Sequence, residues 1–320
     1  MLDVFFTIDV EVWCDGWQDI DARFPAAFER CIYGPGRQGG LPQQLQILSL
    51  SDHGLLGVCF IEPLFAGRFG AEPLREVVGL VQSAGHEVQL HLHTEWVDEA
   101  RTPLLPQVQG KRQHLRNFGR DEQTTLIGLG AQWLEQAGAP RPTAFRAGNF
   151  AFNADTLAAL AANGIAIDSS YNASTFGPSS GVCEGELLEH ARQLGPVLEL
   201  PMTVYADGRG LRHAQLTACS WAELEALLWQ AADYGHGQFV LLSHSFELTT
   251  PGMRRVDPVV VRRLHRLAAF LDRHRDYFRV RGLRGTPPQP VAPAQPRLNS
   301  PLWRTGLRVL EQAWRWSYVR

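Results

Sequence analysis

The residues with the clearest chemical potential are His91 and His93, near the end of the apolar segment GHEVQLHLHTEW at 85–96. Side chains two positions apart on a β-strand lie on one face, so both imidazoles would point the same way. Glu95 has the same parity and joins them if the strand continues. Imidazole and carboxylate groups are common ligands for zinc and other divalent metals. The alternative is that one histidine lies in the core and the other at its rim.

Two acids stand at the end of the first apolar segment. Residues 2–10 (LDVFFTIDV) are rich in Phe, Val and Ile, which predicts a strand. This strand delivers Asp9 and Glu11, whose spacing allows both carboxylates to face one side. A carboxylate with two histidines is a common metal triad that leaves positions open for water and substrate.

Three later predicted strands also end in polar residues. They deliver Arg146 and Asn149 (143–150), Asp168 and Tyr171 (165–171), and His244 (239–248). In parallel α/β folds the site is built at the carboxyl ends of the strands. We therefore expect the polar residues of the five strand ends to gather at one rim.

This set of groups suits the metal-assisted hydrolysis of an amide or ester. A bound metal lowers the pKa of water, Asp9 would take its proton as general base, and His244 would protonate the leaving amine as general acid. Arg146 and Asp168 carry opposite charges that suit holding Asp9 and His244 in the required protonation states.

The elements that must position these residues are predicted as alternating strands and helices, which is typical of a parallel sheet with crossover helices. Apolar periodicity predicts helices at 41–54, 72–85, 121–138, 153–164, 220–235 and 258–274. Further strands are predicted at 55–62, 197–205 and 277–283, with loops at 14–40 and 172–195.

Length, composition and charge limit the domain organisation and the partners of the chain. The chain has 320 residues, of which 45% are hydrophobic and 20% charged, and a net charge of −3, which argues against a nucleic-acid partner. We expect one catalytic domain at 1–285, a proline-rich linker at 286–301, and a basic, Trp-rich amphipathic helix at 302–320. That helix could pack back on the domain, lie on a membrane surface, or bind a protein partner.

The cysteines and the N-terminus indicate a compartment. Five widely spaced cysteines without a CxxC motif suit a reducing environment. The first residues have no basic region and carry acids within the apolar run, unlike a signal peptide. No run approaches the roughly 18 apolar residues of a membrane span. We expect a cytoplasmic protein.

With these residues in place, the chain resembles the polysaccharide deacetylase family, also called the NodB-homology or carbohydrate esterase 4 group. The resemblance covers about residues 1–285 and rests on five motifs in the family's order. Their counterparts are Thr7–Glu11, Gly85–Glu87 with His91–Glu95, Phe145–Phe150, Asp168–Tyr171 and Leu241–His244.

The resemblance implies a distorted (β/α)7-type barrel, a single divalent metal that is most often zinc, and removal of an acetyl group. It also implies that Arg146 orients Asp9 and that Asp168 orients His244. Glu11, His91 and His93 would bind the metal.

The chain departs from the family's motifs in three places. The second acid of the first motif is shifted by one to Glu11, which we expect to be the metal ligand, although Asp9 stays open as the alternative. The position of the second histidine holds Glu95, so His93 is the expected ligand and Glu95 the alternative. The third motif has no Pro-Tyr, so the substrate groove is expected to differ.

The substrate would contact Asn149, Tyr171 and Trp96. An exposed Trp96 ring could stack on a sugar, and core packing is the equal alternative. The favoured function is removal of acetyl groups from an N-acetylated sugar or glycan intermediate. One alternative is hydrolysis of a C–N bond in a small ureide or cyclic amide. The other is a non-catalytic glycan-binding or assembly protein that keeps the metal site.

Overall fold

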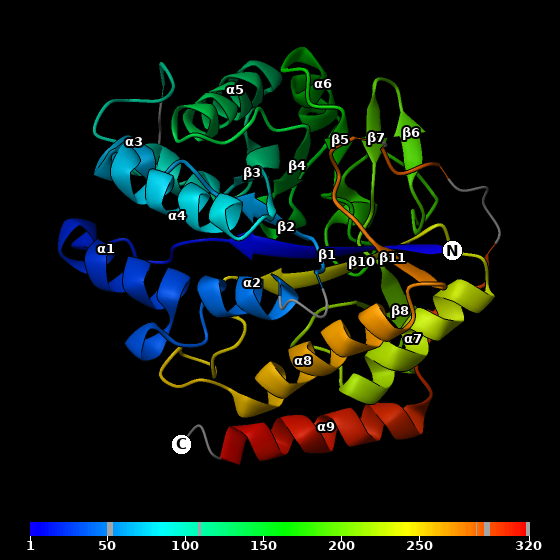
Figure 1. Ribbon diagram of the computed structural model, residues 1–320. Helices are drawn as coiled ribbons and strands as arrows, with labels where there is room; N and C mark the ends of the chain where they lie inside the picture. The colour runs from blue at the N-terminus through cyan, green and yellow to red at the C-terminus, as the bar shows by residue number, and fades with distance from the viewer. Residues whose placement is uncertain (50–53, 108–109, 286, 291–294, 318–320) are drawn as a thin grey trace. The chain divides into compact units, whose positions relative to one another are not determined.

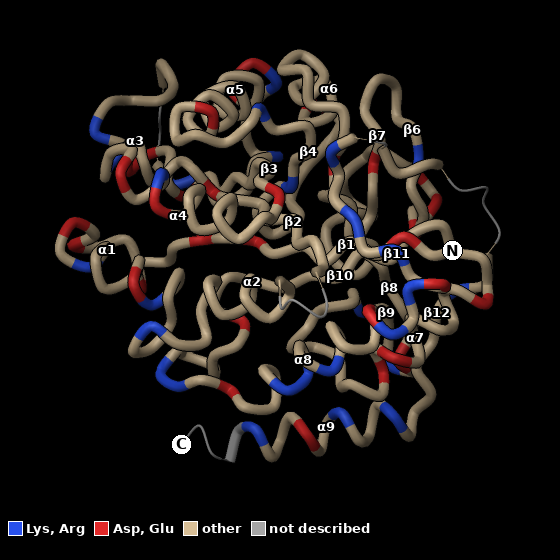
Figure 2. The backbone as a smooth tube through the Cα atoms, in the orientation of Figure 1, with Lys and Arg blue, Asp and Glu red and all other residues tan. Residues whose placement is uncertain are grey.

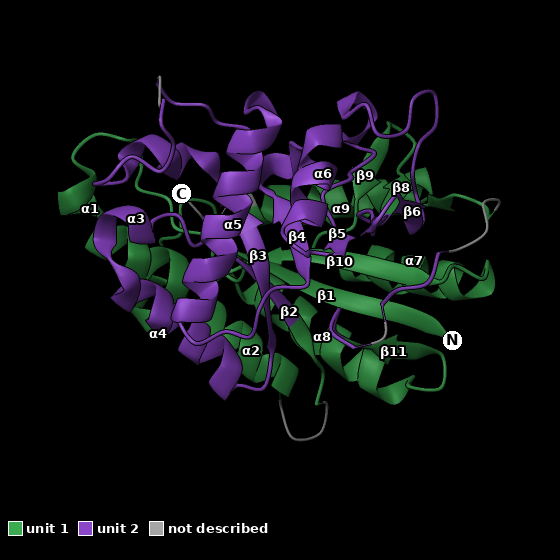
Figure 3. Cartoon of the chain, turned by 90° about the horizontal axis from the view of Figure 1, so that it is seen from above, with its two compact units in different colours: residues 1–57, 204–281, 294–320 green, residues 58–203, 282–293 purple. Residues whose placement is uncertain are grey.

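The chain forms two compact units that are interleaved along the sequence (Figure 3). The computed structural model describes residues 1–49, 54–107, 110–285, 287–290 and 295–317. Unit 1 comprises residues 1–57, 204–281 and 294–320, and unit 2 comprises residues 58–203 and 282–293. Residues 294–320, which the sequence analysis sets apart from residues 1–285, group with unit 1. The expected extent of the catalytic domain stays a prediction.

Unit 1 combines strands from both ends of the chain (Figure 1). Its main elements are β1 (Leu2–Val10), α1 (Ile20–Phe28), α2 (Leu41–Ser49), β8 (Val204–Ala206), β9 (Leu211–His213), α7 (Trp221–Asp233), β10 (Gln238–His244), α8 (Pro258–Arg273), β11 (Phe278–Val280), β12 (Leu298–Asn299) and α9 (Leu302–Ser317). Strand β8 lies between β9 and β12 in a small separate sheet.

Strand β1 organises unit 1. All nine of its residues are buried, as its Phe-, Val- and Ile-rich sequence predicts. It pairs in parallel with β10 on one side and with β11 on the other. The register places Asp9 opposite His244. Two predicted strand ends of unit 1 are therefore adjacent.

Unit 2 follows the predicted strand–helix alternation. Its main elements are β2 (Gly57–Ile61), α3 (Ala66–Phe69), α4 (Ala71–Ser83), β3 (Glu87–Leu92), α5 (Arg120–Gln136), β4 (Ala144–Ala147), α6 (Ala154–Ala162), β5 (Ile167–Asp168), β6 (Arg192–Leu194) and β7 (Val197–Glu199). Strands β2, β3, β4, β5 and β7 pair in parallel in that order, and β6 is antiparallel to β7.

Strand β3, which carries His91 and ends one residue before His93, packs closely against a helix. Helix α5 presents Gly130 to it, and a Cβ atom there would lie 3.0 Å from side-chain atoms of both Leu90 and Leu92. That distance is tighter than most real Cβ contacts, so glycine suits this close approach of helix to strand. The register then places His91 opposite Arg146 on β4.

The predicted strand at 197–205 was wrong in one respect, because it divides into β7 and β8. Pro201 lies between them and has no N–H to donate to a sheet. The predicted loop at 14–40 contains helix α1, which buries Ile20, Phe24 and Phe28 at helical spacing. That periodicity was present in the sequence and could have indicated the helix.

Two other predicted boundaries differ. The strand predicted over 143–150 ends at Ala147, because Asn149 and Phe150 take left-handed backbone angles with φ of 54° and 58°. The helix predicted over 41–54 runs from Leu41 to Ser49, and its last predicted residues, 50–53, lie outside the described residues.

Helix α9 packs back on unit 1, one of the three alternatives that the sequence left open. Arg308 is buried and donates hydrogen bonds to Asp207 at 2.7 Å and Glu223 at 2.8 Å. Arg315 donates to Asp257 at 2.8 Å. Within the described residues, the helices are all too short or too polar to cross a membrane.

Candidate active site

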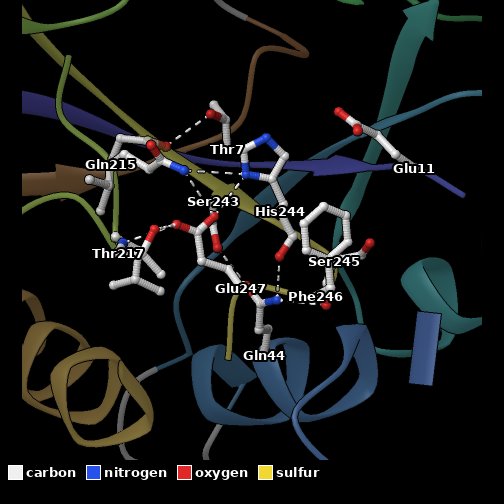
Figure 4. Close-up of polar contacts among 12 residues, drawn as sticks. Thr7, Glu11, Gln44, Gln215, Thr217, Ser243, His244, Ser245, Phe246 and Glu247 are labelled. Atoms are coloured by element: carbon white, nitrogen blue, oxygen red, sulfur yellow. Dashed lines mark hydrogen bonds and ion pairs between the residues drawn. The ribbon is translucent and has the colours of Figure 1, made fainter. Parts of the chain in front are cut away.

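Three of the predicted catalytic and metal-binding residues meet in unit 1. Asp9, Glu11 and His244 have ligand atoms that all lie within 4.8 Å of one another. Both acids are buried, and the backbone N–H of Ser245 donates to the carbonyl of Asp9 at 2.9 Å. Figure 4 shows His244 with Glu247 and Gln215 on one side and Glu11 on the other. The strand-end argument therefore holds within this unit.

The imidazole of His244 is held by a carboxylate. Its Nδ1 lies 2.8 Å from Oε2 of Glu247, and its ring stacks on Phe246 with ring centroids 5.5 Å apart. Burial alone lowers the pKa of His244, but the hydrogen bond and charge of Glu247, with the charges of Glu11 and Asp9, raise it to about 9. The ring is therefore protonated at neutral pH, as a general acid must be.

Glu247 was missed by the sequence analysis. It is buried, and it accepts hydrogen bonds from the backbone N–H of Thr217 at 3.0 Å and from the Thr217 hydroxyl. Burial raises the pKa of Glu247, but the hydrogen bond and charge of His244 outweigh it and leave the pKa below its usual range. Its position three residues after His244 was the one sequence signal that could have indicated this pairing.

His91 and His93 lie side by side in unit 2. Both are buried, and their ring centroids are 4.8 Å apart. Nδ1 of His91 lies 2.7 Å from the backbone carbonyl oxygen of Arg146, which can only accept. Nδ1 therefore carries a proton, and Nε2 is the nitrogen of this ring that could bind a metal.

Glu95 is placed behind His93. It belongs to a 3₁₀ turn over Thr94–Glu99, so the strand parity that would have aligned it with the histidines does not extend to it. Its Oε2 lies 3.4 Å from Nδ1 of His93. Carboxylates commonly orient metal-binding histidines through this nitrogen. The arrangement suits His93 as the ligand and Glu95 as its orienting partner.

Arg146 is fully buried at the end of β4. Its Nε donates to the carbonyl of Ser169 at 3.1 Å, and its Nη2 donates to the Ser169 hydroxyl at 3.1 Å. The guanidinium also lies over the ring of Phe60, 4.3 Å from the centroid. These contacts fix the position of the cation. Its expected role in orienting Asp9 stays a prediction.

Asp168 faces a second buried carboxyl group that the sequence analysis missed. It lies opposite Glu199 in the β5–β7 ladder, and the Ser170 hydroxyl donates to it. Burial, partly offset by hydrogen bonds from Ser170 and Glu199 and by the charge of Arg146, raises the pKa of Asp168 to about 6. Burial and the charge of Asp168 also raise the pKa of Glu199 well above its usual range.

Glu62 is a further strand-end acid that the sequence analysis did not single out. It follows β2, is fully buried, and accepts a hydrogen bond from the backbone N–H of Leu64 at 2.7 Å. Burial raises its pKa to about 8, against the lowering effects of the Leu64 N–H and of the charge of His93. The apolar run that ends in Glu62 was the signal, because its acid stands at the same sheet edge as the histidines.

The three residues expected to contact substrate lie in different surroundings. Trp96 is 1% exposed and packs edge-on against Phe65 and Phe69, so of the two alternatives for this ring the structure has core packing. Tyr171 is also fully buried, and its hydroxyl accepts from the backbone N–H of Leu188 at 3.2 Å. Asn149 is exposed just beyond β4.

A pocket of about 520 Å³ adjoins His244 within unit 1. Residues from β9, from the loop after β10 and from α9 line it, and they include Arg212, Gln215, Phe246, Met253 and Arg315. Gln215 Nε2 lies 3.5 Å from Nδ1 of His244. The space beside the candidate general acid is therefore large enough for a small ring and offers amide and guanidinium donors.

The donor chemistry fits a divalent metal of the kind that the resemblance implies. Glu11 supplies a buried carboxylate. Nδ1 of His91 is engaged by the carbonyl of Arg146, so Nε2 is the nitrogen that could bind a metal. The carboxylate of Glu95 lies next to Nδ1 of His93. Two such imidazoles and one carboxylate form a set that binds zinc and related metals well.

Comparisons with known proteins give matches in structure but not in sequence. No family model matches the chain, and no curated protein matches it. A provisionally assigned polysaccharide deacetylase from Mycobacterium smegmatis is 21% identical, with 92% of this chain and 94% of that chain covered, at a TM-score of 0.54.

Two further solved structures are more distant. A family 4 carbohydrate esterase from Streptomyces lividans is 15% identical, with 92% of this chain and 97% of that chain covered, at a TM-score of 0.46. A pseudoenzyme of the same esterase family from Bacillus anthracis is 12% identical, with coverages of 86% and 62%, at a TM-score of 0.41. The likeness to the Mycobacterium smegmatis structure confirms the predicted fold class, and this chain has the distorted (β/α)-barrel fold of the polysaccharide deacetylases.

Proposed function

We propose that the protein is a metal-dependent hydrolase that removes acetyl groups from an N-acetylated sugar or glycan intermediate. The observation that carries this proposal is the group Asp9, Glu11 and His244, whose ligand atoms lie within 4.8 Å of one another. It joins two acids to a histidine that is protonated at neutral pH. Amide hydrolysis needs a base, an acid and an electrophile close together.

In this proposal Glu11, His91 and His93 hold the metal, and the metal is zinc, because two imidazoles and a carboxylate are typical zinc ligands. The metal, when bound, lowers the pKa of water and polarises the acetyl carbonyl. Asp9 takes a proton from the attacking water. His244 gives its Nε2 proton to the leaving amine, while Glu247 stabilises the imidazolium through Nδ1.

Arg146 and Asp168 support the reaction in the proposal, with Arg146 orienting Asp9 and Asp168 orienting His244, as the resemblance implies. The pocket beside His244 would receive the sugar, because its volume of about 520 Å³ suits a monosaccharide or disaccharide unit. Gln215 and Arg212, which line it, supply donors for hydroxyl or anionic groups.

The test is acetate release from N-acetylglucosamine oligosaccharides, measured together with metal content. We expect about one divalent metal per chain and measurable acetate release, both lost in the His91→Ala, His93→Ala double variant. The matched control is His265→Ala, which removes an exposed imidazole from α8 and should change neither.

Two outcomes would contradict the proposal. If the double variant retains metal at the same stoichiometry, His91 and His93 are not metal ligands. One metal per chain with no acetate release, even after reconstitution with zinc, would favour a glycan-binding protein that keeps the site. Circular dichroism of each variant shows whether the fold survives the substitutions.

A further inference from the structure

Helix α9 has its polarity inverted with respect to an ordinary surface helix. The face toward unit 1 is polar, with Thr305, Arg308 and Arg315 at 2%, 3% and 7% exposure. Each makes a hydrogen bond to unit 1, Thr305 to the carbonyl of Asp207 at 3.0 Å and the arginines to buried carboxylates. The helix is therefore held by charge and hydrogen bonds, without using its apolar residues as a core.

The opposite face of α9 is apolar and exposed. Trp303, Leu307, Leu310 and Trp314 recur at helical spacing and are 60%, 52%, 67% and 54% exposed. They form one stripe, because residues three or four apart lie on the same side of a helix. Exposed patches that unite two tryptophans and two leucines are unusual on a soluble surface and mark a place of contact.

Basic side chains border this stripe. A cavity of about 220 Å³ lies between α8 and α9 and is lined by Arg262, Arg266 and Trp314, among others. Neither arginine forms an ion pair with any described residue. The guanidinium of Arg304 lies 4.9 Å from the ring centroid of Trp303. Figure 2 shows Lys and Arg positions in blue along α8 and α9.

The acids do not cancel this charge. Within the described part of α9, the acidic residue is Glu311, and it is paired with the buried Arg263. Arg262 and Arg266, which form no ion pair with the described residues, thus flank the Trp314 end of the stripe. Arg304 flanks the Trp303 end. A partner that covers this face must be apolar in the middle and negatively charged around it.

The size of the stripe argues against a second copy of the chain. From Trp303 to Trp314 the helix rises about 16 Å, and a face about 10 Å wide gives roughly 160 Å². A stable protein interface buries about 800 Å² on each partner. Tryptophans at both ends, leucines between them and arginines alongside are instead the pattern of a helix that lies in a membrane interface.

We propose that α9 docks the protein on an anionic lipid surface. The helix lies in the plane of the membrane, its Trp and Leu stripe enters the boundary between headgroups and acyl chains, and Arg262 and Arg266 bind lipid phosphates. The polar inner face keeps its bonds to unit 1, so docking requires no rearrangement of the fold. This inference is independent of the proposed catalytic activity.

The test is co-sedimentation of the full-length chain with vesicles. One preparation is phosphatidylcholine alone, and the other contains phosphatidylcholine and phosphatidylglycerol in equal parts. We expect binding to the anionic vesicles and little binding to the neutral ones. The Trp303→Ser, Leu310→Ser, Trp314→Ser variant should lose at least about tenfold in affinity, because its apolar surface is gone.

A charge variant tests the basic border separately. Arg262→Gln, Arg266→Gln should bind anionic vesicles about 30-fold more weakly, since each basic residue near such a surface contributes about a factor of five. The matched control is Arg141→Gln, Arg192→Gln, which removes the same charge from two exposed arginines of unit 2 and should bind like the unmodified chain.

Three outcomes would overturn the proposal. The first is no binding of the unmodified chain to either kind of vesicle. The second is equal binding to neutral and anionic vesicles that the arginine variant does not change. The third is a dimer in light scattering that the stripe variant converts to a monomer. This result would mean that the apolar face of α9 binds a second copy of the chain. Circular dichroism checks the fold of each variant.

Discussion

At the scale of single residues, the proposed reaction depends on the pairing of His244 with Glu247. Burial favours the neutral imidazole, and the carboxylate 2.8 Å away overrides it and raises the pKa to about 9. A general acid must hold its proton at the working pH and release it in the reaction. In the proposed reaction Glu247 is therefore a positioning residue that keeps the imidazole of His244 protonated.

Glu247→Gln tests this role. The side chain keeps its shape but loses its charge, so the pKa of His244 should fall from about 9 toward its ordinary value of about 6.5 or lower. The alkaline limit of kcat/KM should move to lower pH by about 2.5 units or more, with little change in KM. NMR titration of the histidine measures the pKa directly.

Stability gives a second readout that does not depend on turnover. Because the folded-state pKa is above the unfolded value, His244 contributes stability that is complete below about pH 6.5 and lost as the pH rises through about 9. This contribution is at most about 3 kcal/mol in metal-free protein and should vanish in Glu247→Gln. Glu72→Gln, on the exposed surface of α4, is the matched control. An unchanged pH profile in Glu247→Gln would exclude the proposed role.

The sequence was a good guide to residues that stand at strand ends and a poor one to their partners. Asp9 and His244 were expected to meet, and the β1–β10 register brings them together. Glu247 and Glu199 were missed because their roles depend on tertiary contacts between loops and strands. Trp96 was open between rim and core, since composition cannot distinguish an aromatic ring that faces a groove from one that is buried.

At the scale of elements, strands were predicted well where they were uniformly apolar, as in β1, and poorly where a single residue interrupts them. Pro201 divides the segment predicted as one strand, and the left-handed angles at Asn149 end β4 early. Helix α9 shows a different limit. Its amphipathic pattern predicts a helix, but the pattern does not state which face is buried, and here the polar face is.

Arg308→Ala tests whether the buried ion pairs hold α9. Arg308 is 3% exposed and donates to Asp207, Glu223 and the hydroxyl of Tyr205. Removing it leaves two buried carboxylates without their shared cation, and such losses cost about 3 to 5 kcal/mol. We expect the free energy of unfolding in urea to fall by that amount.

The control for this substitution is on the same helix. Arg304→Ala removes a partly exposed arginine that forms no ion pair with the described residues, and it should cost less than about 1 kcal/mol. Equal effects of the two substitutions would mean that α9 is held by general packing and not by the Arg308 ion pairs. Unfolding followed by far-ultraviolet circular dichroism makes the comparison.

At the scale of the whole molecule, the two units draw on distant parts of the chain, and this organisation was hidden from the sequence. Composition changes after Gly285 and suggests that a domain ends there, because proline-rich segments often separate domains. Yet β12 pairs with β8, and Asn299 exchanges hydrogen bonds with Gln230 at 2.9 and 3.1 Å. The proline-rich composition indicates a stiff segment. It does not indicate the contacts of this segment with unit 1, because those contacts are made with residues far away in the sequence.

Truncation to residues 1–285 therefore tests where the folded unit ends. It removes β12, with Leu298 buried at 1% exposure, and the arginines of α9 that pair with Asp207, Glu223 and Asp257. Each hydrogen bond lost costs about 1 kcal/mol, and together with the ion pairs the loss is comparable to the total stability of about 5 to 15 kcal/mol typical of a domain. We expect unit 1 to lose cooperative unfolding and amide protection in β8 and α7. Truncation to residues 1–317 is the control, and peptides from residues 58–203 are the internal reference. If residues 1–285 unfold cooperatively within a few degrees of the full chain, the C-terminal segment is an accessory and the catalytic domain ends where its composition changes.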